Sequence, residues 1–239
     1  MNYNEDNLVL FHMPSEGELL KEKTGVLARL RNHRIIVTDR MKQAFLNVPR
    51  EEFVLKQYRD SAYIDRPLPI LANQTISAIH MVMIYVAPSC TDPQMGEKIL
   101  EIGAGSGYNA AMYAEMVAPK DAENPGHVYA VEIIPELVDF ARENIEKTGY
   151  SDRVTIISGD GGLGYPSEAP YDIISVAAAS KKVPPPLLEQ LDGSGRLAIP
   201  VGGRFSYQEL LVIQKEEDNN FTEKNLGGVA FVPLTGKYG

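Results

Sequence analysis

Apolar and charged positions alternate at helical spacing through the first third of the chain. The segment 16–48 has this period and predicts two helices, the second capped by Thr38 or Asp39. Two prolines within 63–69 exclude a helix there and predict an extended, fixed loop. An apolar stretch over 78–86, followed by Pro88, predicts a further helix.

The middle of the chain has a different hydrophobic pattern, in which short apolar runs alternate with segments of helical periodicity. The runs predict strands over 98–102, 127–132, 154–158, 171–176 and 196–201. The patterns between them predict helices over 109–117, 135–147 and 186–191. Strands and helices that alternate at this spacing form right-handed βαβ units, so the fold class is α/β with a mostly parallel, doubly wound sheet.

The C-terminal part departs from this alternation. Two strands are predicted over 209–215 and 228–232, with no helix between them. A parallel crossover needs a dozen or more residues, usually as a helix. The last two strands are therefore expected to form an antiparallel pair appended to the parallel sheet.

Composition excludes several classes of function. Lys and Arg total 23 against 32 Asp and Glu, a net charge of −9, so nucleic acids and anionic membranes are not expected as partners. Cys90 is the single cysteine, which rules out an intrachain disulfide and a cysteine-based zinc site. The four histidines (His12, His33, His80 and His127) are not spaced as metal ligands, so no metal is predicted.

Neither a targeting segment nor a membrane span is expected from the sequence. Residues 1–13 are acidic and contain no apolar segment of the kind a secretory signal needs. The longest apolar run, 81–87, is far shorter than the ~20 residues that cross a bilayer. The expected location is the cytoplasm.

A glycine-rich loop follows the first predicted strand of the central region. Gly103, Gly105 and Gly107 lie between this strand and a helix, a context in which the loop is either a tight turn or a ligand-binding turn. A dinucleotide-binding loop would need a small residue where Tyr108 stands, which disfavours a nicotinamide oxidoreductase. The loop instead resembles the nucleoside-binding loop of class I S-adenosylmethionine-dependent methyltransferases.

Acidic residues end the next two strands, where open α/β sheets place their ligand contacts. Glu132 can accept hydrogen bonds from two ribose hydroxyls, although alone it would be interpreted as a solvated acid at a strand end. Asp160, between two glycines, can accept from an adenine amino group, although Gly-Asp-Gly by itself is an ordinary turn. Together with the glycine loop, these features favour a nucleoside cofactor.

Three further residues have more than one interpretation. Ser77 lacks the context of a nucleophile elbow, no His/Asp pair for it is evident, and local chemistry favours a helix N-cap. His80 on an apolar helix is interpreted locally as a packed or capping residue. Cys90 is interpreted as structural.

Sequence motifs along most of the chain resemble the protein-L-isoaspartate (D-aspartate) O-methyltransferase family. The Thr-Ile-Ser segment and the Val-Pro-Leu ending are specific to it, whereas the glycine loop is widespread among methyltransferases. In order, the motifs are Asn47-Val-Pro-Arg-Glu-Glu-Phe53, Tyr63-Ile-Asp-Arg-Pro-Leu-Pro-Ile70, Gln74-Thr-Ile-Ser77, Leu100-Glu-Ile-Gly-Ala-Gly-Ser-Gly-Tyr108, Gly159-Asp-Gly161, Ala169-Pro-Tyr-Asp172, Ile199-Pro-Val-Gly202 and Phe231-Val-Pro-Leu-Thr235.

The resemblance implies a Rossmann-like class I methyltransferase fold, with N-terminal helices and an antiparallel C-terminal strand pair. We expect a single domain over 1–239, made of an N-terminal substrate-loop region (1–95), a cofactor-binding core (96–202) and C-terminal strands (203–239). It also implies that Ser77 is the active-site serine. The implied cofactor-binding residues are Ile76, His80, Glu101, Gly103, Gly105, Ser106, Gly107, Glu132, Asp160, Gly161 and Thr235.

The implied activity is repair of damaged proteins. The methyl donor would be S-adenosyl-L-methionine, the product S-adenosyl-L-homocysteine, and the substrates isoaspartyl-containing proteins and peptides, with the enzyme expected to be a monomer. Two alternatives stay open: a class I methyltransferase acting on a small molecule or RNA, and a catalytically silent S-adenosylmethionine-binding protein.

Overall fold

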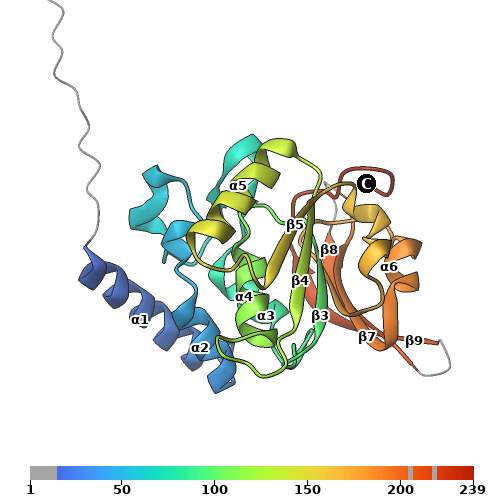
Figure 1. Cartoon of the computed structure of the whole chain (residues 1–239), viewed down its shortest axis with the longest axis horizontal. Coiled ribbons are helices and arrows are strands. Elements are labelled where there is room, and N and C mark those ends of the chain that lie inside the picture. Colours follow the sequence, from blue (N-terminus) through green and yellow to red (C-terminus); the bar gives the residue numbers. More distant parts are fainter. Residues whose placement is uncertain (1–14, 204–206, 217–219) are drawn as a thin grey trace, which may run out of the picture.

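The computed structural model describes residues 15–203, 207–216 and 220–239 (Figure 1). The N-terminal segment expected to carry no secretory signal, together with His12, lies outside the described residues. Within those ranges no helix is long and apolar enough to cross a membrane.

A seven-stranded sheet in the order β5-β4-β3-β6-β7-β8-β9 forms the centre of the fold. The pairs among β5, β4, β3, β6 and β7 are parallel and β8–β9 is antiparallel, as the sequence predicts. The β7–β8 pair is antiparallel as well. The strands are β3 (Lys98–Ile102), β4 (His127–Glu132), β5 (Val154–Ser158), β6 (Tyr171–Val176), β7 (Leu191–Val201), β8 (Gln208–Lys215) and β9 (Phe221–Val229).

The strand order reverses between β3 and β6. From β3 the chain runs outward to β4 and β5, then returns to the other side of β3 for β6 and β7. The carboxyl ends of β3, β4 and β5 lie at one edge of the sheet because their pairing is parallel and in register. A reversal of this kind opens a crevice at that edge, where ligands bind in open α/β sheets.

Alternate residues of each strand face opposite sides of the sheet, so the fold has two apolar cores. Ile99 and Ile173 belong to the larger core, beneath α4 (Tyr108–Val117) and α5 (Pro135–Lys147). Their chain neighbours Leu100 and Ile174 belong to the smaller core, beneath α6 (Pro185–Glu189). Helices therefore cover both faces, most of them on one (Figure 1).

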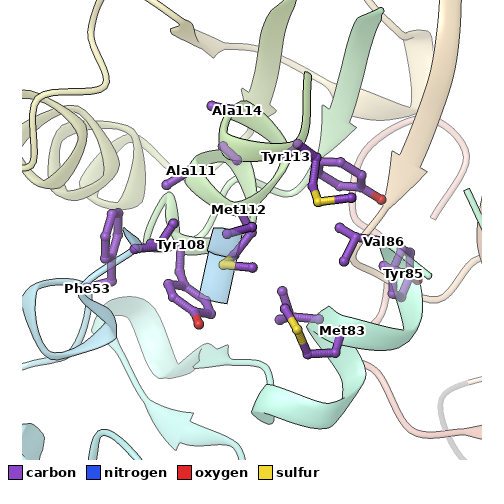
Figure 2. Packing of buried hydrophobic residues seen from close by; sticks show 14 of the residues in the cluster. Phe53, Met83, Tyr85, Val86, Tyr108, Ala111, Met112, Tyr113 and Ala114 are labelled. Atoms are coloured by element: carbon purple, nitrogen blue, oxygen red, sulfur yellow. The ribbon is translucent and has the colours of Figure 1, made fainter. Parts of the chain in front are cut away.

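The larger core extends from the sheet to the N-terminal helices. Figure 2 shows Tyr108 and Met112 of α4 lying between Phe53 on one side and Met83 of α3 (Ile79–Tyr85) on the other. The Phe53 and Tyr108 rings meet edge to face, with centroids 5.6 Å apart. This packing connects the N-terminal region to the helix that follows the glycine loop.

The first two helices are both capped, and only the cap of the second was predicted. Ser15 and Glu18 form a capping box at the start of α1 (Glu16–Asn32). Thr38, rather than Asp39, caps α2 (Asp39–Asn47), since its side chain accepts a hydrogen bond from the Met41 amide.

The predicted extended loop over 63–69 is partly a strand. β1 (Leu68–Pro69) pairs antiparallel with β2 (Thr75–Ile76), which leads directly into α3. The Tyr85 hydroxyl donates a hydrogen bond of 2.7 Å to the Val176 carbonyl, which ties α3 to the end of β6. These contacts hold the segment around Ser77 over the carboxyl edge of the sheet.

Two boundaries near the C-terminus differ from the prediction. The last strand is β9 over Phe221–Val229, whereas the sequence predicts 228–232. β9 is an edge strand and exposes polar side chains, so it lacks the apolar run that marks a buried strand. In addition, α6 ends at Glu189, and Leu191, predicted as helical, begins β7.

Candidate active site

A cavity lies at the carboxyl edge of the sheet, above the reversal of strand order. Its walls come from β2, the ends of β3 and β4, the glycine loop and the chain after β9. Nine of the predicted site residues line it: Ile76, Ser77, Glu101, Gly103, Gly105, Ser106, Glu132, Gly161 and Thr235. His80, Gly107 and Asp160 do not line it.

Glycine is required in the loop for conformational reasons. Gly103, Gly105 and Gly107 have φ values of 89°, 56° and 84°, a region that strains residues with a Cβ atom. Gly107 is the N-cap of α4 and lies against Ile145 of α5, which explains why it is outside the cavity wall. Gly161 is required for another reason, because a Cβ there would collide with the Ile102 side chain.

Glu132 is 5% exposed and holds the glycine loop in place. One carboxylate oxygen accepts from the Gly105 amide at 3.0 Å, and the other accepts from the Ile134 amide at 3.0 Å. Each oxygen keeps a lone pair, so the carboxylate can still accept two hydroxyl groups from a ligand in the cavity. The interpretation as a solvated strand-end acid is wrong.

Glu101 is fully buried, and its burial raises its pKa to about 8. Its Oε1 accepts a 2.8 Å hydrogen bond from Asn109 Nδ2. Its Oε2 and the Asn109 Oδ1 have no partner among the described residues, and both residues line the cavity. Two buried acceptors without donors form a site for a hydrogen-bond donor, preferably a cationic one.

Asp160 holds the C-terminal turn at the cavity's edge. Its Oδ1 accepts from the Gly162 amide at 2.9 Å, and its Oδ2 accepts from the Lys237 amide at 2.8 Å. The carboxylate therefore joins the end of β5 to the segment that contains Thr235, which does line the cavity.

A second, apolar groove meets the cavity at Thr75, Ser77, Ala177 and Val232, which line both. The groove runs between α3 and the segment 226–232 that ends β9, and His80 is in its wall. The structure thus places His80 in the groove and not in the cavity with the glycine loop. Ser77 stands where the two spaces join.

Ser77 is not the cap of α3. The N-cap residue is Ala78, and the Ser77 hydroxyl makes no hydrogen bond within the described ranges. The local interpretation as a cap is wrong because the chain stays extended for one residue longer, with Ala78 at ψ 149°. The hydroxyl is left for a ligand.

The position of Ser77 depends on Arg50, a residue that sequence reasoning did not assign to the site. The Arg50 side chain is fully buried and donates to the Ala62 carbonyl at 2.8 Å and to the Ser77 carbonyl at 2.7 Å. Its guanidinium lies 4.8 Å from the centroid of the Tyr108 ring. In the sequence, Arg50 is marked only by its place in the motif 47–53. That motif indicates the family but does not indicate that Arg50 contacts Ser77.

A His/Asp pair lies beside Ser77, although none was evident from the sequence. Asp65 Oδ1 is 3.0 Å from His80 Nδ1 and accepts from the His80 amide at 2.9 Å. Asp65 lies in a loop, 15 residues before His80, so only the fold brings the two together. Cys90 is buried in the larger core, as expected for a structural thiol, and burial raises its pKa to about 12.

The sheet order, the positive-φ glycine loop at the reversal and the buried acid at the end of β4 define a class I S-adenosylmethionine-dependent methyltransferase. Solved structures support this class. A protein-L-isoaspartate O-methyltransferase aligns over 91% of this chain and 67% of its own, with 29% identity and a TM-score of 0.80. A putative protein-L-isoaspartate O-methyltransferase from Plasmodium falciparum, in complex with S-adenosyl-L-homocysteine, aligns over 90% and 98%, with 27% identity and a TM-score of 0.78.

Sequence relatives identify the family within this class. The protein-L-isoaspartate O-methyltransferase of Staphylothermus marinus is 53% identical over 91% of this chain and 96% of its own length. That of Thermococcus sibiricus is 48% identical over 94% and 98%. The family model for protein-L-isoaspartate(D-aspartate) O-methyltransferase matches residues 21–239. The chain belongs to the protein-L-isoaspartate(D-aspartate) O-methyltransferase family.

Proposed function

We propose that the protein repairs damaged proteins by transferring a methyl group from S-adenosylmethionine to the free carboxylate of damaged aspartyl residues, which is the α-carboxylate in L-isoaspartyl residues and the side-chain carboxylate in D-aspartyl residues. The observation that carries this proposal is the junction of two spaces at Ser77. A cavity with nucleoside-type contacts lies on one side, and a groove open to a peptide lies on the other.

The cavity fits the proposed cofactor. The unpartnered Glu101 Oε2 and Asn109 Oδ1 suit the α-ammonium group of a methionine moiety. Glu132 offers acceptors for the ribose hydroxyls, and Gly161, which lines the cavity and has no side chain, leaves room for a base beside Asp160. We propose that Ile76, Gly103, Gly105, Ser106 and Thr235 complete the binding site, and that Gly107 acts only by shaping the loop.

No general base is needed for this reaction. An α-carboxylate has an ordinary pKa near ~3.5 and is ionised at neutral pH, so it is already a nucleophile. S-adenosylmethionine supplies an electrophilic methyl group on a sulfonium when it is bound. The work of this chain is to orient the carboxylate and exclude water, and alignment of that kind can contribute about 7–11 kcal/mol.

Ser77 is the residue proposed to orient the carboxylate. Its hydroxyl is free of protein partners among the described residues and lies at the junction of cavity and groove. It would donate one hydrogen bond to a carboxylate oxygen and would not attack the substrate. In the resulting methyl ester, the adjacent backbone amide nitrogen attacks the ester carbonyl and expels methanol, which gives a succinimide whose hydrolysis by water returns some normal aspartate.

Several expectations stay predictions. They are that the whole chain acts as a single domain, that it is a cytoplasmic monomer, and that it has no nucleic-acid or membrane partner. The net charge of −9 supports the last of these. No group of three or more potential metal-ligating side chains lies in the described parts of the chain.

The test is transfer of labelled methyl from S-adenosylmethionine to an isoaspartyl peptide, with the same peptide containing normal aspartate as the control. We expect labelling of the isoaspartyl peptide only. Equal labelling of both peptides would contradict the proposal. With tRNA as a second acceptor in the same assay, labelling of tRNA alone would favour an RNA methyltransferase. Cofactor binding without transfer to either acceptor would favour the silent binding protein.

A further inference from the structure

The groove beside Ser77 is almost without charge. Of the described residues that line it, most are apolar, and none is Lys, Arg, Asp or Glu. The cavity that it joins is lined by the acids Glu101 and Glu132, and again by no Lys or Arg among described residues. A substrate carboxylate therefore enters a space that is apolar on one side and acidic on the other.

His80 is the one described residue of the groove wall that can become cationic. Its side chain is 42% exposed, and Nδ1 lies 3.0 Å from Asp65 Oδ1. A carboxylate only accepts hydrogen bonds, so Nδ1 must carry a proton in this pair. The other nitrogen, Nε2, makes no hydrogen bond with any described residue and remains for a ligand.

Asp65 also fixes the orientation of the ring. Asp65 Oδ1 accepts one hydrogen bond from the His80 backbone amide at 2.9 Å and another from the ring nitrogen Nδ1. The ring is therefore fixed relative to its own backbone. The nearby positive charge of Arg50 interacts with Asp65 and in turn anchors the carbonyl of Ser77. Arg50 is therefore bonded to the Ser77 carbonyl and lies close enough to Asp65 for their charges to attract.

We propose that the Asp65–His80 pair recognises the α-carboxylate of the isoaspartyl substrate. This inference rests on the proposed function and gives His80 a defined role toward the substrate carboxylate, whereas the family resemblance implies only that His80 lies against cofactor and substrate. When its ring carries both protons, His80 donates from Nε2 to one carboxylate oxygen, and Ser77 orients the carboxylate from the junction. Asp65 is a positioning residue that accepts from Nδ1 and fixes the orientation of the ring.

The experiment compares two ligands on the protein saturated with S-adenosylhomocysteine, which carries no sulfonium charge of its own. One ligand is an isoaspartyl hexapeptide, and the other is the same peptide with its α-carboxylate replaced by a carboxamide. Binding of each to the wild type, His80→Gln and Asp65→Asn is measured by calorimetry. His127→Gln is the matched control, because His127 begins β4 and bonds with Thr155 away from the groove.

We expect the wild type and His127→Gln to prefer the carboxylate peptide by about tenfold or more, the effect of a hydrogen bond to a charged group. His80→Gln should reduce this preference to about threefold or less, and Asp65→Asn to an intermediate value. In turnover assays His80→Gln should raise KM for the isoaspartyl peptide much more than it lowers kcat. S-adenosylhomocysteine affinity should stay within about twofold of wild type in all variants.

An unchanged carboxylate preference in His80→Gln would overturn the inference. So would a loss of S-adenosylhomocysteine affinity with the preference intact, which would return His80 to the cofactor. His80→Ala, at a half-exposed position, repeats the comparison without the amide that glutamine introduces. If the wild type neither bound nor methylated the isoaspartyl peptide, the proposed function itself would fail, and this result differs from every outcome that concerns His80 alone.

Discussion

The cofactor side and the substrate side of the site are built in different ways. On the cofactor side, acids at the ends of parallel strands bond to backbone amides two residues away, as Glu132 does to Ile134 and Asp160 to Gly162, and also to the distant amides of Gly105 and Lys237. On the substrate side, the contacts span 15 residues from Asp65 to His80 and 27 residues from Arg50 to Ser77. The first half is built on the edge of a regular sheet, where parallel strands bring their ends together, and the second depends on a buried cation that joins irregular segments.

The largest effect on the difference between the two sides is expected from a substitution of Arg50. Arg50→Met removes the donor to the carbonyls of Ala62 and Ser77 and leaves both unpaired in the core. We expect the free energy of unfolding to fall by about 3 kcal/mol or more, measured by urea denaturation. Arg29→Met, at an exposed position of α1, is the control and should change little. Equal denaturation midpoints for the two variants would show that Arg50 does not hold the substrate side together.

This difference also explains how far the sequence could predict the site. The glycine loop, Glu132 and Gly161 were found because each lies at or within a few residues of the end of a predicted strand, and parallel strands bring their ends together. The Asp65–His80 pair was missed because a loop position gives no local sign of its distant partner. The boundary of β9 was missed for a related reason: its exposed residues are polar, whereas the apolar run after it lines the groove.

Ser77→Ala tests whether the Ser77 hydroxyl contributes to methyl transfer without contributing to stability. Because Ser77 does not cap α3, we expect no loss of thermal stability. Loss of one hydrogen bond to a charged group is worth about 1.5–3 kcal/mol, so single-turnover methyl transfer should slow by roughly ten- to a hundredfold. S-adenosylhomocysteine affinity should not change. Ser89→Ala, on the exposed loop after α3, is the control; an undiminished rate in Ser77→Ala would remove Ser77 from the mechanism.

Glu132→Ala tests the cofactor side, and it should weaken cofactor binding while leaving peptide binding unchanged. It frees the amides of Gly105 and Ile134 and removes the acceptor proposed for the ribose. S-adenosylhomocysteine binding should weaken by about 1–3 kcal/mol in calorimetry, while the peptide KM at saturating cofactor stays near that of the wild type. Glu136→Ala in the first turn of α5 is exposed and serves as the control. Wild-type affinity in Glu132→Ala would exclude the ribose contact.

The smallest expected effect is a pH dependence of cofactor binding. Burial raises the pKa of Glu101 to about 8, so the free protein carries this carboxyl protonated at neutral pH. An ammonium group favours the ionised form, and binding therefore releases a proton. Affinity for S-adenosylhomocysteine should rise as pH increases toward about 8, by at most about tenfold per unit, and then level off because Glu101 is already ionised in the free protein.

Glu101→Gln is the control for this titration. It should abolish the proton release, which calorimetry in buffers of different ionisation enthalpy detects. A wild-type affinity that is flat between pH 6 and about pH 8 would contradict a titrating Glu101.

The hydrogen bond from the Lys237 amide to Asp160 links the exchange rate of this amide to the turn at the edge of the cavity. Its proton is shielded from solvent only while the C-terminal turn is closed on that carboxylate, since amide exchange requires the bond to open. Gly161 and Thr235, which lie close in the chain to the two partners of this bond, line the cavity, so we expect an occupant to slow the deuterium uptake of the Lys237 amide. The signal comes from the protein's own backbone, so it needs neither a label nor turnover, and it would distinguish a loaded molecule from an empty one in a mixture.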